Sequence, residues 1–158
     1  MAKKMIIEKS VDINKPITTV YDFIKISRNQ DKFSVWNMAD PNQKVTTSGT
    51  DGTVGYQYSW DSTNKNVGAG KQTITKLMPN EEIAYLLQFE RPMKNTATSK
   101  FLTKELGPDK TRVTWTFEGE TKFPMSLFSF IFKGMLGKDL QKGLDNLKGL
   151  LEGSNSSW

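Results

Sequence analysis

The chain has 158 residues, a formal net charge of +5 and 36% hydrophobic residues, which fits one soluble globular domain with a substantial core. It contains neither cysteine nor histidine, so disulfides, thiolate chemistry and the commonest general base and metal ligand are excluded. Acid–base chemistry would have to use Asp, Glu, Lys or Tyr. No run of carboxylates has the spacing of a metal site, and we expect neither a metal nor a cofactor.

The positive charge is spread along the chain, because the lysines alternate with acidic residues and form no dense basic run. A mixed, solvated surface explains this pattern, so we expect no nucleic-acid partner. The N-terminal ten residues lack a long apolar run, and the most apolar segment, Phe123–Phe132, has about half of the ~20 residues that a membrane-spanning helix needs. We therefore expect a cytoplasmic protein without stable membrane insertion.

The N-terminal third of the chain predicts one strand followed by short helical segments. Residues Met5–Ile13 mix apolar and charged residues as a strand does. Asn14 offers a cap and Pro16 suits a first helical turn, so a helix is predicted to begin there. Apolar residues then recur at helical spacing: Ile17, Val20, Tyr21 and Ile24. A second short helix or loop contains Phe33 and Trp36, and the sequence ADPNQ predicts a turn.

The middle of the chain predicts consecutive antiparallel strands. Turn sequences separate them at even spacing: SGTDG, STNKN, MPNEE, RPMKN and LGPDK. The strands are expected at Lys44–Ser48, Thr53–Asp61, Gly68–Met78, Glu82–Phe89, Ala97–Glu105 and Thr111–Glu118.

The last segment changes to a helical period. An amphipathic helix is predicted over about Lys133–Leu151, and residues 153–158 form a polar tail. Leu140, Leu144 and Leu147 are expected to face the sheet, and Gly143 to allow close approach to a strand. One sheet with two small early helices and one long late helix is an α+β architecture in a single domain, residues 1–152.

The stretch VGYQYSW places Tyr56, Tyr58 and Trp60 on one face of a strand. Neighbouring strands add more rings to this face, together with small residues such as Gly70 and Ser99, which we expect to leave unfilled volume. Buried tyrosine, glutamine and serine groups need partners, or each costs about 1–3 kcal/mol. A cavity with water or a ligand satisfies them more easily than a dry core. A packed aromatic core with hydroxyls at the sheet edge is the alternative.

The whole chain resembles a known family over Met5–Glu152. The resemblance rests on four sequence segments: FSVWNMADPN, GTVGYQYSWDSTNKNVGAGKQTIT, TRVTWTFEGE and MLGKDLQKGLDNLKGLLE. These are similar to bacterial members of the START-like superfamily of polyketide cyclases/dehydrases and lipid-transfer proteins. The resemblance implies the helix-grip fold, in which a seven-stranded curved antiparallel sheet wraps around a long C-terminal helix, with two short helices after the first strand and an apolar cavity. No catalytic motif of a characterised member is matched residue by residue.

Three functions stay open. The first is binding of a small hydrophobic or amphipathic molecule in the aromatic-lined cavity. The expected lining is Trp36, Tyr56, Tyr58, Trp60, Gln72, Tyr85, Phe89, Ser99, Trp115, Phe117 and Leu140. The second is a cyclase- or dehydratase-type enzyme for aromatic or lipid-like substrates, with a tyrosine as proton donor and Asp40 or Asp61 as base if buried. The third is a protein- or RNA-interaction domain with a basic outer face. Phe123–Phe132 is either a packed linker or a mobile lid.

Overall fold

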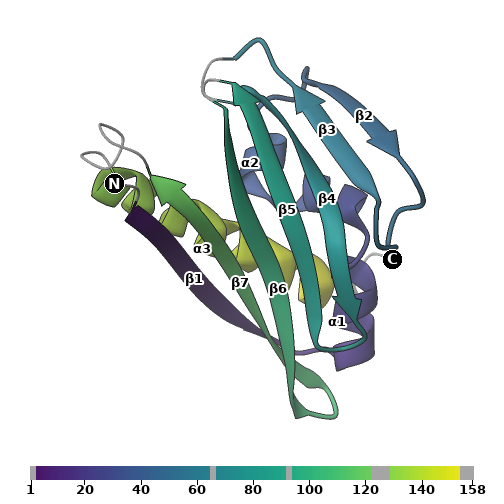
Figure 1. Cartoon of the computed structure of the whole chain (residues 1–158). Coiled ribbons are helices and arrows are strands. Elements are labelled where there is room, and N and C mark those ends of the chain that lie inside the picture. Colours follow the sequence, from purple (N-terminus) through teal and green to yellow (C-terminus); the bar gives the residue numbers. More distant parts are fainter. Residues whose placement is uncertain (1–2, 65–66, 92–93, 122–128, 154–158) are drawn as a thin grey trace.

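The computed structural model describes residues 3–64, 67–91, 94–121 and 129–153, and every structural statement below concerns these residues. Seven antiparallel strands form one sheet in the order β1-β7-β6-β5-β4-β3-β2, so all strands except β1 pair with their neighbours along the chain. Figure 1 shows that the sheet is curved and that α3 and the short helices lie on the same side of it. We call the sheet face that these helices cover the inner face.

The elements occur in the predicted order. The strands are β1 (Lys3–Ile13), β2 (Lys44–Ser48), β3 (Gln57–Asp61), β4 (Ala69–Met78), β5 (Glu82–Arg91), β6 (Asn95–Gly107) and β7 (Lys110–Thr121). The helices are α1 (Ile17–Ile24), the 3₁₀ helix η1 (Ser27–Lys32), α2 (Val35–Met38) and α3 (Ser129–Gly153). The seven-stranded sheet, the long last helix and the short helices after β1 confirm the expected fold. No described helix is both long enough and apolar enough to span a membrane.

Several element boundaries differ from the prediction, and three of these differences involve specific contacts or a predicted segment. Strand β3 begins at Gln57 rather than Thr53, because the N–H groups of Thr53 and Tyr56 are used in turn hydrogen bonds. Pro16, not Asn14, is the N-cap of α1, and the Asn14 N–H instead donates to the Glu152 carboxylate at 2.7 Å. Helix α3 begins at residue 129, which places the end of the apolar segment 123–132 in the helix. Residues 123–128 of that segment lie outside the described residues, so its role as linker or lid stays a prediction.

The core lies between the inner face and α3. Leu140, Leu144 and Leu147 are fully buried, as predicted from their spacing. A Cβ added at Gly143 would lie 2.9 Å from Cζ3 of Trp115 in β7, so this glycine allows the close approach that was expected. The Trp115 ring stacks on Phe101 of β6 at a centroid distance of 4.7 Å. Helix and sheet are therefore in direct contact through an aromatic cluster.

Helix α3 also covers part of the edge strand β1. Lys148 Nζ donates to the Asp12 carbonyl at 2.6 Å, and Gln141 Nε2 donates to the Ser10 carbonyl at 3.4 Å. A strand at a sheet edge exposes unpaired backbone groups, and these side chains of α3 occupy two of them. The contacts fix the position of α3 along the sheet.

Candidate functional site

The side chains that the sequence placed on the inner face of the strands do lie there. Tyr85 and Leu87 on β5 and Trp115 and Phe117 on β7 are buried on the inner face, whereas Gln88 is exposed on the outer face. All members of the predicted lining lie on this inner side of the sheet. They are Tyr56, Tyr58, Trp60, Gln72, Tyr85, Phe89, Ser99, Trp115 and Phe117 from the sheet region, with Trp36 from α2 and Leu140 from α3.

Burial changes along this inner face. On β5, Tyr85 is 1% exposed and Leu87 7%, whereas Phe89 is only partly buried. On the neighbouring strands, Gln72 and Trp60 are also only partly buried. The inner face is therefore closed around Tyr85 and accessible at the end where Trp60 and Phe89 lie. We call this accessible part the open end.

Gly70 does not leave the unfilled volume that was expected. A Cβ added there would lie 2.7 Å from Cζ2 of Trp60, its cross-strand neighbour on β3. The Trp60 ring also meets the Phe89 ring at a centroid distance of 5.9 Å, and its Nε1 donates to the Val67 carbonyl at 3.3 Å. The glycine makes room for the Trp60 ring, which occupies the space above it.

Ser99 is satisfied within the protein. Its hydroxyl donates to the Thr116 carbonyl at 2.8 Å and accepts from Trp115 Nε1 at 3.1 Å. The expectation that its polar atom needs water or a ligand is therefore wrong. At this position the alternative of a packed aromatic core is correct.

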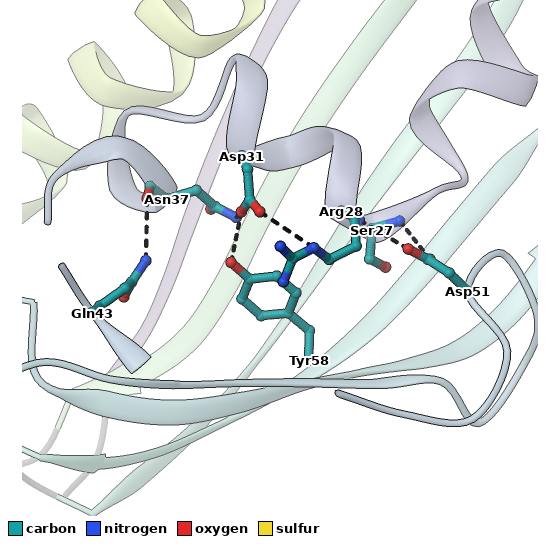
Figure 2. A network of polar contacts seen from close by, with 7 residues as sticks. All are labelled: Ser27, Arg28, Asp31, Asn37, Gln43, Asp51 and Tyr58. Carbon is teal, nitrogen blue, oxygen red and sulfur yellow. Dashed lines mark hydrogen bonds and ion pairs between the residues drawn. The ribbon is translucent and has the colours of Figure 1, made fainter. Parts of the chain in front are cut away.

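Tyr58 belongs to a polar network between β3 and the short helices (Figure 2). Its hydroxyl donates to Asp31 Oδ1 at 2.6 Å, and Asn37 Nδ2 donates to the same oxygen at 3.0 Å. Arg28 lies 3.5 Å from the other Asp31 oxygen, and its guanidinium carbon is 5.5 Å from the centre of the Tyr58 ring. Burial, followed by the Asp31 hydrogen bond, raises the pKa of Tyr58, so its hydroxyl stays protonated as the donor.

A second carboxylate holds η1 from its other end. Asp51 accepts the N–H of Ser27 at 2.7 Å and that of Arg28 at 3.0 Å, where η1 begins (Figure 2). Trp36 of α2 donates from Nε1 to Asp139 of α3 at 3.0 Å. The short helices are thus tied to the sheet, to the loop before β3 and to α3. Sequence reasoning missed Arg28, Asp31 and Asp51, whose contacts join distant segments.

Tyr85 differs from Tyr58 because its hydroxyl has no partner among the described residues. The same holds for Nε2 of Gln30 and Oγ of Ser27, both on η1. Burial raises the pKa of Tyr85, and the neighbouring Gln30 amide partly opposes this rise. Unpartnered buried groups of this kind cost about 1–3 kcal/mol each. Ser27 and Gln30 were not predicted.

The two aspartates considered as bases are occupied elsewhere. Asp40 accepts the Asn42 N–H at 2.9 Å and the hydroxyl of Ser62, as a turn residue does. Asp61 is exposed and paired with Arg91. Among the described residues, no three acidic side chains come together in a way that could hold a metal ion.

A surface groove of about 480 Å³ lies between β1 and α3. Its lining is Ile6, Ile7, Glu8, Lys9, Gly137, Lys138 and Gln141. None of these residues was predicted to line a site, and the groove is more charged than the inner face. We therefore place the candidate site on the inner face.

Solved structures with the same fold cover nearly the whole chain. Truncated norcoclaurine synthase from Thalictrum flavum is similar with a TM-score of 0.70 and 10% identity, over 96% of this chain and 95% of that one. The same enzyme in complex with dopamine and hydroxybenzaldehyde gives a TM-score of 0.70 at 10% identity, over 95% and 87%. The Aha1 dimer from Colwellia psychrerythraea gives 0.63 at 18% identity, over 94% and 96%. At these identities the similarity shows the fold alone.

Sequence comparison assigns the family. Among curated proteins, no sequence matches this chain significantly. A family model described as polyketide cyclase / dehydrase and lipid transport matches residues 4–152, and the chain therefore belongs to that family.

Proposed function

We propose that the protein binds a small hydrophobic or amphipathic molecule between the inner face of the sheet and helices α2 and α3. The observation that carries this proposal is the change of burial along the inner face. Trp60 and Phe89 are partly exposed at the open end, although large rings of this kind are normally covered in a packed core. Half-buried Gln72 lies beside them on β4 and adds a polar group to an otherwise apolar surface.

The apolar part of the ligand would lie against the rings of the open end. Trp36 of α2 adds a further ring beside Phe117 of β7, at a centroid distance of 6.1 Å. Leu140 of α3 is buried and forms part of the opposite wall. Each Å² of apolar surface that the ligand removes from water contributes about 25 cal/mol before the cost of association.

The family supports this proposal at a coarse level. Its description includes lipid transport alongside polyketide cyclases and dehydrases. A structural neighbour holds the aromatic molecules dopamine and hydroxybenzaldehyde on the same fold. We propose binding rather than catalysis because Asp40 and Asp61, the two acids considered as bases, have other partners.

Native mass spectrometry and a fluorescent probe test the proposal together. Protein purified from its own host is expected to carry a co-purified small molecule. The emptied protein is expected to bind 1-anilinonaphthalene-8-sulfonate saturably, and Phe89→Ala should weaken this binding several-fold. Leu106→Ala is the control, because Leu106 is 37% exposed on β6 and lies outside the predicted lining. Absence of saturable binding in the emptied protein, or equal losses in both variants, would show that the inner face binds no ligand.

A further inference from the structure

Ser27 and Gln30 of η1 and Tyr85 of β5 are buried polar side chains without a well-formed hydrogen bond among the described residues. Ser27 and Gln30 lie three residues apart on a 3₁₀ helix, which has three residues per turn, so they project from the same side of it. Tyr85 lies opposite on β5, close enough to Gln30 for the amide to affect its pKa. Ser27 and Tyr85 are each 1% exposed and Gln30 is 3% exposed. Bulk water therefore does not satisfy these groups.

The chemistry of these groups selects for a hydrogen-bond acceptor. Gln30 Nε2 can only donate. The Tyr85 hydroxyl stays protonated, because burial raises its pKa, and it can donate as well. The Ser27 hydroxyl rotates freely between donating and accepting. One acceptor oxygen placed between them would receive up to three hydrogen bonds.

The charge around these groups disfavours an anion. Asp51 holds the start of η1 and acts electrostatically on Tyr85, raising its pKa further. The nearest cation in the network, Arg28, is directed at Asp31 and the Tyr58 ring. A ligand carboxylate would thus lose its hydration close to the negative charge of Asp51, and no cation would pair with the carboxylate. An uncharged acceptor avoids that cost.

The polar groups lie within reach of the open end. Ile74 pairs with Tyr85 and Gln72 pairs with Leu87, so Gln72 and Tyr85 are diagonal neighbours on adjacent strands. Diagonal positions on one face are about 7–8 Å apart. Gln72 is half-buried, whereas Tyr85 is closed off. A ligand that enters beside Gln72 therefore needs to extend by about two residues of strand, roughly 7 Å, to reach Tyr85.

We propose that the bound molecule carries an uncharged hydrogen-bond acceptor, such as the carbonyl oxygen of an aromatic or lipid-like ketone, ester or amide, which binds between Tyr85, Gln30 and Ser27. This inference rests on the proposed function, because it names the chemistry of the ligand's inner end. It assigns the apolar end of the ligand to the rings of the open end. Tyr85 and Gln30 then select neutral carbonyl compounds over hydrocarbons and carboxylates.

Three matched probes test this selection: 2-acetylnaphthalene, its isosteric alkene 2-isopropenylnaphthalene, and 2-naphthoate. Their affinities for the wild-type protein and for Tyr85→Phe are measured by calorimetry. The preference for the ketone over the alkene is expected to fall by about tenfold in the variant, as for the loss of one well-formed hydrogen bond. In the wild-type protein, 2-naphthoate is expected to bind more weakly than the ketone.

Two further variants test whether the preference for the ketone depends on these particular polar groups. Gln30→Met keeps the side-chain length and should reduce the preference for the ketone in the same direction. Tyr21→Phe is the control, because the Tyr21 hydroxyl is also buried but donates to the Glu82 carbonyl at 3.1 Å. It should leave the preference unchanged. Tyr85→Phe removes only a hydroxyl without a partner, so it should fold.

The outcomes separate the two proposals. If none of the naphthalenes binds the wild-type protein, the proposed function itself fails. If the ketone and the alkene bind but their ratio is the same in the wild-type protein, Tyr85→Phe and Gln30→Met, the polar groups hold an internal water molecule only and the inference is wrong. Binding of 2-naphthoate as tightly as the ketone would overturn the selection for an uncharged acceptor.

Discussion

Gly143 of α3 lies directly against the ring of Trp115 on β7. A Cβ at this position would be 2.9 Å from Cζ3 of the ring and 3.5 Å from the Phe33 carbonyl oxygen. The ring cannot move aside easily, because it stacks on Phe101 and its Nε1 is hydrogen-bonded to Ser99. The distance between helix and sheet is therefore set by the absence of a side chain at residue 143.

Replacement of Gly143 by alanine should destabilise the protein. Overpacking of a well-filled core costs about 1–3 kcal/mol, which exceeds the gain of about 0.5–1 kcal/mol from replacing a helical glycine. Gly149→Ala is the matched control, because an added Cβ there meets nothing within 4 Å. It should stabilise the same helix. Denaturant unfolding of both variants measures the difference, and equal effects would mean that α3 packs less closely than described.

Removal of the Asp51 carboxylate should loosen η1. Asp51 accepts the first two N–H groups of η1, and loss of such a cap costs about 0.5–2 kcal/mol. Asp51→Ala is therefore expected to lower the free energy of unfolding by about 1 kcal/mol. Asp61→Ala is the control, because Asp61 forms an exposed ion pair that contributes little. A larger loss in Asp61→Ala than in Asp51→Ala would contradict the assigned role of Asp51.

The contact between α3 and the end of β1 should depend on pH. Lys148, followed by the Asn14 N–H, lowers the pKa of Glu152 from 4.5, against the opposing effect of partial burial. A carboxyl whose folded-state pKa is depressed contributes stability above its unfolded pKa, and this stability is lost as the pH falls through the folded value. Wild type should therefore be more stable than Glu152→Gln at pH 7, and the difference should shrink below about pH 4.5.

Thermal unfolding across pH 3 to 7 measures this difference. Glu152→Gln introduced into the Lys148→Met variant should lower the stability less at pH 7 than it does in the wild type. Lys148, the main cause of the lowered Glu152 pKa, is then absent. An unchanged effect in that background would assign the stabilisation to the Asn14 N–H alone.

The local pattern of the sequence predicted the fold well. Alternation of apolar and polar residues fixed which face of each strand is buried, as for Trp115 and Phe117 on β7. The leucine spacing of the last segment predicted which side of α3 meets the sheet. The start of β3 was misplaced because residues 50–56 form turns, in which Gly52 and Gly55 adopt positive φ angles and the N–H groups of Thr53 and Tyr56 donate to carbonyls within the turns. The glycines were visible, but their conformation depends on contacts that the sequence does not show.

The candidate site was predicted only in outline. The aromatic residues of the site were identified from the alternation of residues along each strand. Their hydrogen-bonding and packing partners were not identified, because each partner comes from a distant segment. Ser99 meets Trp115 across the β6–β7 pairing, and Gly70 meets Trp60 through the register of β3 and β4. The contact of Tyr58 with Asp31 joins a strand to a helix that lies 27 residues earlier. Register and helix placement decide these contacts, and neither follows from local periodicity.

Truncation of Trp60 should cost less stability than truncation of Phe101. Phe101 is fully buried and touches the rings of Phe33, Tyr85 and Trp115, so Phe101→Ala is expected to cost about 3–5 kcal/mol. Trp60 lies at the open end, is only partly buried and contacts the Phe89 ring and the backbone at Gly70. Its replacement by alanine loses fewer contacts, and the loss should fall below that range.

The same two variants separate packing from binding. Trp60→Ala should remain folded at 25 °C and bind 1-anilinonaphthalene-8-sulfonate with changed affinity, because the ring that covers Gly70 is gone and the open end is wider. Denaturant melts give the stabilities, and probe titrations of the folded variant give the affinity. A loss of stability equal to that of Phe101→Ala, with unaltered probe binding, would mean that Trp60 is an ordinary core residue and that the open end takes no ligand.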